Sequence, residues 1–139
     1  MNKTLYDSAK DHLGSGFPDC LPMEQAYVHI GMYLGWVIES GLFSDYFKEE
    51  ASSQIFRFKR KEISCTVLSG IWNGHLVSEF LNDSANRFTV FYYVSGLYRD
   101  DYEAVLGRAL PSMYHVDDTW LNYERLKSRI EERYEAWAT

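Results

Sequence analysis

Hydrophobic positions are densest between Ala26 and Ile38, where thirteen residues form an almost continuous apolar run. At 100° per residue these side chains make one broad face, and Met32 and Trp36 extend the apolar surface to the far side. The pattern predicts a helix from about Pro22 to Ser40 that the rest of the fold covers on several sides. Because a membrane span needs ~20 apolar residues, we expect a central core helix.

Three glycines in this region have expected structural roles. Gly41 suits the left-handed position that ends a helix. Gly31 and Gly35 lie four residues apart, a spacing that marks dimerising helices when it occurs within a membrane. Since no span is predicted here, we expect these two glycines to allow close packing within the fold.

A second periodic stripe runs through the C-terminal segment to about Trp137. Charged residues occupy the other side, and Asp117 or Asp118 is expected to cap the helix. Burial of the stripe must stabilise this helix, because exposed ion pairs along a helix contribute only ~0.3–0.5 kcal/mol each. The apolar stripe consists of Tyr123, Leu126, Ile130, Tyr134 and Trp137.

The middle of the chain is less regular. Ser44 is expected to cap a short helix, and residues 51–54 are expected to form a loop or a weak helix. Residues 56–72 are predicted to form one helix that ends at Asn73–Gly74, although their β-branched content leaves a strand open. Asn82 or Ser84 is expected to cap a helix to about Ser95, and residues 88–94 could instead form a strand.

Together these elements predict a mostly α-helical, single compact domain over residues 1–139. About five or six helices are expected to surround the buried first helix, with a short helix at 100–106 among them. Residues 1–21 are predicted to be an irregular lead-in, because two glycines and two prolines fall within residues 14–22. Short strands in 56–72 or 88–94 remain an alternative.

Composition narrows the classes of function. The net charge is −6 and the one basic run, Arg57 to Lys61, is short, so a nucleic-acid binder is not expected. The acidic balance favours solubility or a basic partner. Cys20 and Cys65 lack the spacing of a zinc or redox motif, and the first residues lack a secretory apolar core. We therefore expect a cytoplasmic protein with two free thiols, no cofactor and no metal.

The histidines offer two candidate sites. None of the four forms the His-Glu-x-x-His pair that binds zinc on a helix. His29 is expected to be a hydrogen-bonded core residue, and the alternative is a ligand or base. His115 precedes Asp117 and Asp118, which could together form an acid/base group or half of a metal site. Capping of the next helix is the favoured interpretation of these aspartates, so no catalytic residue is predicted.

Acidic residues near two predicted helix starts suggest a partner-binding surface. They could form one tyrosine-edged face for a basic partner, although carboxylates at helix starts also stabilise the helix dipole. Nothing in the sequence places the two groups side by side. The predicted surface comprises Tyr98, Asp100, Asp101, Glu103, Asp117 and Asp118.

Three stretches carry a family resemblance: "AYVHIGMYLGWVIESGLFS" (26–44), "YYVSGLYRDDYEAVLG" (92–107) and "YHVDDTWLNYERLKSRIEERYEAW" (114–137). They resemble a family of small uncharacterised bacterial proteins with His-Ile-Gly-Met and Val-x-Asp-Thr-Trp motifs, whose members resemble immunity proteins of antibacterial toxins. The resemblance covers most of the chain and is least clear over residues 48–72.

This resemblance implies a non-enzymatic, cytoplasmic protein that binds a cognate secreted toxin or effector and covers its active site. It implies no cofactor, and the divergent middle of the chain could contact the toxin. The net charge and the short apolar run already argue against nucleic acid and membrane as partners. Two alternatives stay open. One is a small ligand-binding or enzymatic domain using His29 or His115. The other is a helical adaptor or homo-oligomeric structural protein, for which a homodimer is the simplest form.

Overall fold

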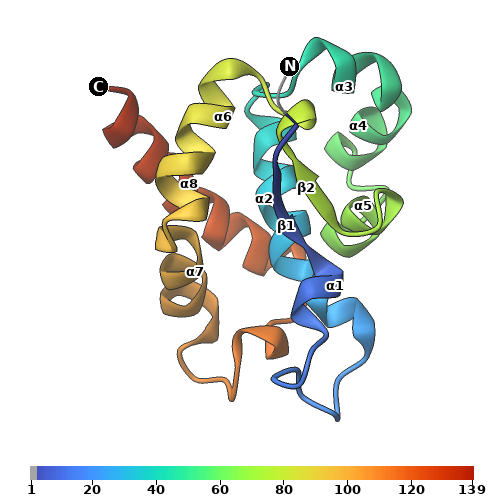
Figure 1. Ribbon diagram of the computed structural model, residues 1–139, viewed down its shortest axis with the longest axis vertical. Coiled ribbons are helices and arrows are strands. Elements are labelled where there is room, and N and C mark those ends of the chain that lie inside the picture. Colours follow the sequence, from blue (N-terminus) through green and yellow to red (C-terminus); the bar gives the residue numbers. More distant parts are fainter. Residues whose placement is uncertain (1–2) are drawn as a thin grey trace.

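The computed structural model describes residues 3–139 and places one buried helix at the centre. This helix, α2 (Val28–Glu39), follows a 3₁₀ turn at Met23–Tyr27, and every residue from Val28 to Ile38 is buried. Figure 1 shows α3, α4 and α5 on one side of α2 and α6 and α7 on the other. The prediction of a core helix is confirmed, and Gly41 ends it with a φ of +69°.

Close packing explains the two glycines of α2. A Cβ atom on Gly31 would lie 2.0 Å from the carbonyl oxygen of Cys65, and one on Gly35 would lie 2.6 Å from the Phe58 ring. The chain from α4 and α5 therefore contacts the α2 backbone directly. This confirms the expectation that both glycines serve packing within the fold.

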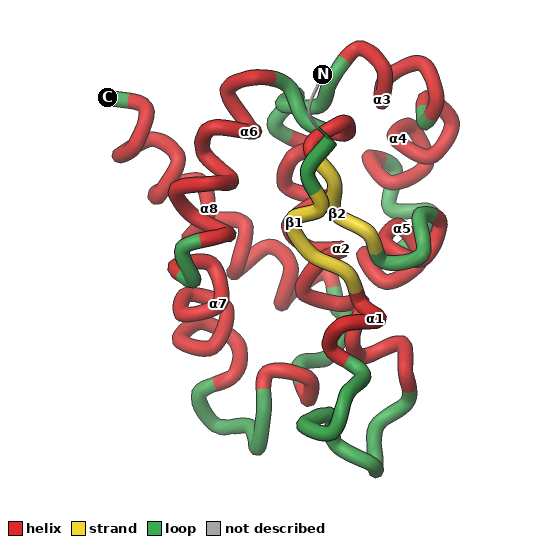
Figure 2. The backbone as a smooth tube through the Cα atoms, in the orientation of Figure 1, coloured by secondary structure: helices red, strands yellow, loops and turns green. Residues whose placement is uncertain are grey.

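The N-terminal segment is more ordered than the sequence suggested. Strand β1 (Leu5–Ser8) and the short helix α1 (Ala9–His12) replace part of the predicted irregular lead-in, whose residues 1–2 lie outside the described part. Strand β1 pairs antiparallel with β2 (His75–Val77), with Leu5 opposite Val77 (Figure 2). The two strands lie outside 56–72 and 88–94, so the alternative strand positions were wrong.

The predicted single helix over residues 56–72 is in fact two helices. After α3 (Asp45–Glu50), α4 (Ser52–Lys59) and α5 (Cys65–Ile71) are separated by a turn in which Lys61 has a φ of 61°. The Ser64 hydroxyl starts α5 by accepting a hydrogen bond from the Val67 N–H. Residues 51–54 therefore belong mostly to α4. Ser44 caps α3 as expected.

The segment in doubt between Phe88 and Val94 is helical. Asn82 caps α6 (Asp83–Thr89), which continues as a π-helical turn, η3 (Val90–Val94), and then ends at Gly96 with a φ of +98°. Next comes α7 (Leu97–Tyr102), which also widens into a π-helical turn, η4 (Glu103–Gly107). A π turn holds more residues than an α turn, so each widening rotates the side chains that follow it.

The last helix is α8 (Trp120–Ala138). Two short 3₁₀ turns also occur before it: Ser78–Phe80 follows β2, and Met113–His115 lies between η4 and α8. The cap of α8 is Thr119, which accepts a hydrogen bond from the Asn122 N–H, so the prediction of Asp117 or Asp118 was wrong. The first three stripe residues are buried and the last two are half-buried. Between residues 3 and 139 the fold has eight α-helices, more than the five or six predicted because 56–72 is divided and α1 was missed.

An ion-pair network joins α7 to α8. The Asp101 side chain is 4% exposed and accepts hydrogen bonds from Tyr92 (2.7 Å), Arg133 (2.9 Å) and Arg129 (3.1 Å). Burial alone would raise the pKa of Asp101, but the Arg133 hydrogen bond and charge outweigh it, aided by Tyr92 and Arg129. The folded pKa therefore lies below its ordinary value.

Asp101→Asn should destabilise the protein at neutral pH by about 1.5–3 kcal/mol, the range for hydrogen bonds to charged groups. Since the folded pKa is depressed, this stability is present above the unfolded pKa of ~3.9 and is lost as the pH falls through the folded value. Urea unfolding at pH 7 and pH 3 should show the variant and the native protein converging in acid. Asp100→Asn, at an exposed neighbour, is the control, and an equal deficit at both pH values would contradict the prediction.

Candidate functional site

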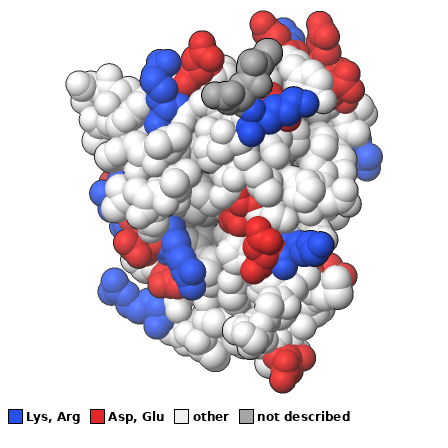
Figure 3. Space-filling view, in the orientation of Figure 1, with Lys and Arg blue, Asp and Glu red and all other residues white. Residues whose placement is uncertain are grey.

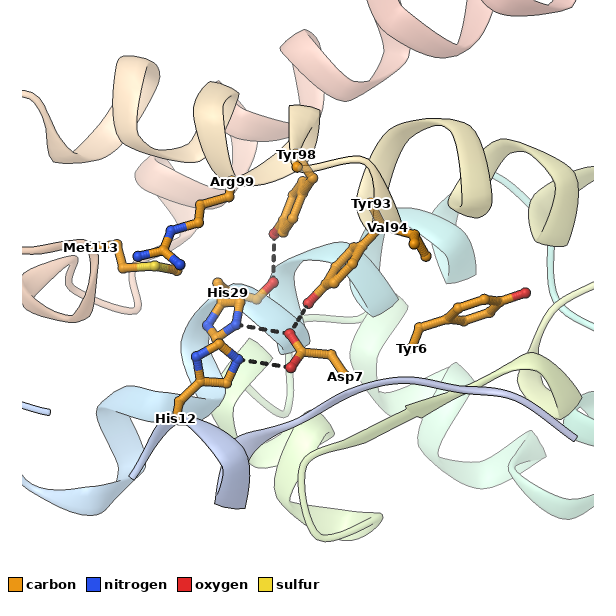
Figure 4. A pocket seen from close by; sticks show the side chains of 10 residues that line it. Tyr6, Asp7, His12, His29, Tyr93, Val94, Tyr98, Arg99 and Met113 are labelled. Atoms are coloured by element: carbon orange, nitrogen blue, oxygen red, sulfur yellow. Dashed lines mark hydrogen bonds and ion pairs between the residues drawn. The ribbon is translucent and has the colours of Figure 1, made fainter. Parts of the chain in front are cut away.

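Polar side chains from five separate segments meet beside the N-terminal end of α2. Asp7 lies on β1, His12 ends α1, His29 lies in the first turn of α2 and Tyr93 lies on η3 (Figure 4). The fifth segment is the 3₁₀ turn of Met113 and Tyr114. We call this group the Asp7 cluster: Asp7, His12, His29, Tyr93 and Tyr114.

The carboxylate of Asp7 is the centre of the cluster. Its Oδ1 accepts from the Ser8 N–H (2.8 Å) and from Nε2 of His12 (2.7 Å). Its Oδ2 accepts from Nε2 of His29 (3.1 Å) and from the Tyr93 hydroxyl. A carboxylate has about four lone-pair positions, so these donors satisfy it fully.

Electrostatics keep Asp7 ionised and His29 neutral. Burial would raise the pKa of Asp7, but the hydrogen bonds from His12, His29 and Tyr93 together place it well below its ordinary value. Burial lowers the pKa of His29 by more than its contact with Asp7 raises it. Burial and the Asp7 charge raise the pKa of Tyr93, which stays a donor. The cluster therefore carries the negative charge of Asp7 beside two neutral donors, His29 and Tyr93.

The outer parts of the cluster hold the two imidazoles in place. Nδ1 of His12 lies 2.6 Å from the Tyr114 hydroxyl, and the rings of His12 and His29 meet edge to face with centroids 4.5 Å apart. The buried Tyr98 donates its hydroxyl to the carbonyl oxygen of His29. Tyr114 thus orients the His12 ring, and Tyr98 fixes the backbone from which the His29 ring projects.

A cavity of about 260 Å³ opens beside the cluster. In Figure 4, Arg99 and Met113 face the two histidines across it, while Tyr6 and Val94 lie toward its other end. The side chains of Asp7 and His12 are 14% and 19% exposed, so solvent reaches them from this cavity. The cluster is therefore accessible to a small ion or molecule.

His29 is a buried core histidine, as the sequence predicted, and it also lines the cavity. It is 4% exposed and hydrogen-bonded, which confirms a hydrogen-bonded core histidine, yet it also lines the cavity. His115 does not join it: its Nδ1 lies 2.8 Å from the Ser112 hydroxyl, and it is absent from the residues that line the cavity. Asp118 binds the Thr66 N–H (2.9 Å) instead of pairing with His115.

Sequence reasoning missed most of the cluster. Asp7 and His12 lie in the segment read as an irregular lead-in, and Tyr93 and Tyr114 were not singled out as polar site residues. The sequence pattern that could have indicated the cluster was the pair of Asp7 and His12, five residues apart near the start of the chain. That spacing is uninformative without β1 and α1, because Asp7 meets partners 22 and 86 residues away.

The predicted acidic surface is not one surface. Tyr98 and Asp101 are buried, at 2% and 3% exposure, so they cannot contact a partner from where they lie. Glu103 is exposed but pairs with Arg99 (3.4 Å), and Asp118 is held by α5. Asp100 and Asp117 are exposed, and their role in partner binding stays a prediction.

A different surface is apolar and open. Val90, Phe91 and Val94 on η3 are 55%, 46% and 57% exposed, whereas Tyr92 of the same turn is buried. The Tyr6 hydroxyl donates to Asn86 one turn earlier (2.8 Å), and Tyr6 and Val94 both line the cavity, so this surface reaches the cavity's rim. We call it the 90–94 surface. Figure 3 shows few charged side chains over this part of the molecule.

Fold and cluster define a mostly helical domain with a histidine–aspartate cluster beside a small cavity. The chain belongs to the family described as Domain of unknown function (DUF7832), whose model matches residues 5–116. That range includes every member of the Asp7 cluster and ends before α8. No curated protein and no solved structure shows significant similarity to the chain. Across residues 3–139, the structure contains no helix that is both long and apolar enough to cross a membrane.

Proposed function

We propose that this protein is a non-enzymatic, cytoplasmic protein of the immunity type, which binds a cognate bacterial toxin and neutralises it by covering the toxin's active site. The resemblance of residues 26–44, 92–107 and 114–137 to immunity-like proteins is the source of this proposal. The structural observation that supports it is the 90–94 surface. Contiguous exposed apolar residues on a soluble protein mark interaction sites more often than chance exposure does.

The chemistry of this surface suits a protein partner. Phe91 stacks loosely on Trp137, with ring centroids 6.5 Å apart, which provides an aromatic anchor of the kind that dominates binding energies. The net charge of −6 favours a basic toxin through long-range attraction. The partner is therefore expected to be a basic protein with an apolar patch beside its active site.

The test uses the gene next to the one that encodes this protein, where the proposal expects a toxin. Co-expression should restore growth to cells that the neighbouring product kills, and the two proteins should co-purify. Val90→Asp combined with Val94→Asp should abolish both effects, because two charges would be buried at the interface. Val67→Asp is the control, since Val67 is 51% exposed on α5.

Two results would count against the proposal in different ways. Failure of the native protein to rescue cells from the neighbouring toxin would contradict the immunity function itself. Full rescue by the double variant, with loss of rescue by Val67→Asp, would keep the function and move the contact surface to the 48–72 region.

A second candidate function, a small ligand-binding or enzymatic domain, is favoured by the cavity beside His29. His29→Gln separates the two candidates, because glutamine can still donate a hydrogen bond to Asp7 while losing the imidazole. Unchanged toxin rescue by this folded variant would show that neutralisation needs no imidazole chemistry. Loss of rescue, with the variant folded and the 90–94 surface intact, would favour the second candidate.

A further inference from the structure

Three side chains of the Asp7 cluster present atoms that typically bind metals. One ring nitrogen of His12, one ring nitrogen of His29 and a carboxylate oxygen of Asp7 lie within 4.8 Å of one another. They come from α1, α2 and β1, so the tertiary fold brings them together. Two imidazoles and one carboxylate form a ligand set that suits Zn²⁺, Fe²⁺ and related ions.

The separations are close to those that a metal ion requires. Ligand atoms bound at ~2.0–2.2 Å around a tetrahedral ion lie about 3.3–3.6 Å from one another. The two histidine nitrogens now lie 2.7 Å and 3.1 Å from the Asp7 oxygens that they contact. Ion entry thus requires an adjustment of side chains whose ligand atoms already lie within 4.8 Å of one another.

The groups around the three side chains match the outer shell of a metal site. When Nε2 of His12 binds an ion, its Nδ1 carries the proton, and the Tyr114 hydroxyl lies 2.6 Å away to accept it. The Ser8 N–H holds Oδ1 of Asp7, which leaves Oδ2 to turn toward the ion. Such outer partners fix the orientation of ligands before the ion arrives.

The cavity supplies the open side of the site. Catalytic or ligand-binding metal sites use three protein ligands and leave a position free, whereas structural zinc sites use four. Here the cavity of about 260 Å³ borders all three side chains, and Arg99 lines its opposite wall (Figure 4). A water molecule or a small anion could occupy the free position, with Arg99 nearby to balance the anion's charge.

We propose that His12, His29 and Asp7 bind one divalent transition-metal ion of the Zn²⁺ or Fe²⁺ class, with the free coordination position facing the cavity. In the metal-free state each Nε2–H donates to Asp7. On binding, each imidazole stays neutral and changes tautomer: the Nε2 proton is replaced by a proton on Nδ1, and the freed Nε2 lone pair coordinates the ion. The proposal goes beyond toxin neutralisation and does not depend on it.

The experiment measures binding to the full-length protein after dialysis against a chelator. Titration with Co²⁺, followed by visible absorption, should saturate at one ion per chain, and Zn²⁺ should displace the Co²⁺. His12→Gln should weaken binding at least tenfold. His75→Gln is the matched control, because His75 is exposed at the start of β2 and lies outside the cluster. Tyr114→Phe, which keeps all three ligands, should weaken binding by ~10-fold or more.

Nuclear magnetic resonance of the native protein provides a measurement that needs no variant. Addition of Zn²⁺ should shift the imidazole signals of His12 and His29 and leave those of His75 and His115 in place. Absence of saturable binding at one ion per chain would overturn the proposal. So would shifts confined to His75 or His115, or a folded His12→Gln variant that binds Co²⁺ as tightly as the native protein.

Discussion

Gly31→Ala should lower the free energy of unfolding by about 3 kcal/mol, the upper end of the usual cost of overpacking a core. The added methyl group would lie 2.0 Å from the carbonyl oxygen and 2.6 Å from the carbonyl carbon of Cys65. Those are backbone atoms near the start of α5, so no side-chain rotation relieves the clash. Either α2 or α5 must move, and α2 is buried on every side. Urea denaturation followed by circular dichroism measures the change.

Gly70→Ala is the matched control, because it makes the same substitution within α5. Its Cβ atom would meet the Tyr27 ring at 3.6 Å, which is ordinary van der Waals contact. Alanine favours helix over glycine by ~1 kcal/mol, so this variant should be as stable as the native protein or more stable. Equal stability of the two variants would mean that α2 and α5 are not packed as described.

Phe88→Ala should cost about 3–5 kcal/mol, the range for removing a buried aromatic side chain. Phe88 is fully buried and its ring stacks on Tyr92 with centroids 5.0 Å apart. It also meets Trp36 of α2 and Tyr134 of α8, so one side chain joins three helices. The cavity left by alanine could not be filled without moving all three. Thermal and urea unfolding should both report the loss.

Phe91→Ala is the control three residues later. Phe91 is 46% exposed, so removing its ring should cost about 1 kcal/mol, since about half of its apolar area stays in water after folding. Because both variants replace phenylalanine by alanine, any difference in their stability reports the difference in burial of the two rings. If both variants lost the same stability, the assignment of Phe88 to the core and Phe91 to the surface would be wrong.

The sequence predicted the central helix because its evidence was local. A run from Ala26 to Ile38 with few polar side chains has to be surrounded, and Gly41 ended the helix for the steric reason anticipated. The last helix was predicted by the same periodic reasoning. Its cap was missed because Thr119 and the two aspartates before it are all good caps, and the Thr66 N–H attracted Asp118 instead.

The division of residues 56–72 into two helices was not predictable from periodicity. Ile63, Val67 and Ile71 are spaced like one helical face, yet Val67 and Ile71 are exposed and Ile63 is buried. The turn depends on Lys61 adopting a left-handed backbone conformation, which a non-glycine residue adopts at some cost. The packing of Phe58 against α2 and of Cys65 against Gly31 offsets the free-energy cost of this backbone conformation at Lys61.

The candidate site escaped prediction because its contacts are long-range and its residues are unremarkable singly. His29 was correctly expected to be buried and hydrogen-bonded, but its partner Asp7 lay in a segment without periodicity. Conversely, Asp101 was expected on a surface because charged residues usually are exposed. Two arginines of α8 and Tyr92 allow its burial. All three are distant from Asp101 in the sequence, so no local motif indicated the pairing.

The π-helical turn at Val90–Val94 makes this part of the chain sensitive to the number of its residues as well as to their identity. Tyr92 reaches Asp101 on one side and Tyr93 reaches Asp7 on another. Deleting one residue would return the backbone to an ordinary α-helix and change the directions in which Tyr92 and Tyr93 point relative to each other. Both polar networks would be broken together. Insertions and deletions should therefore be tolerated far less here than in the exposed turn at 108–111, where length can drift during evolution.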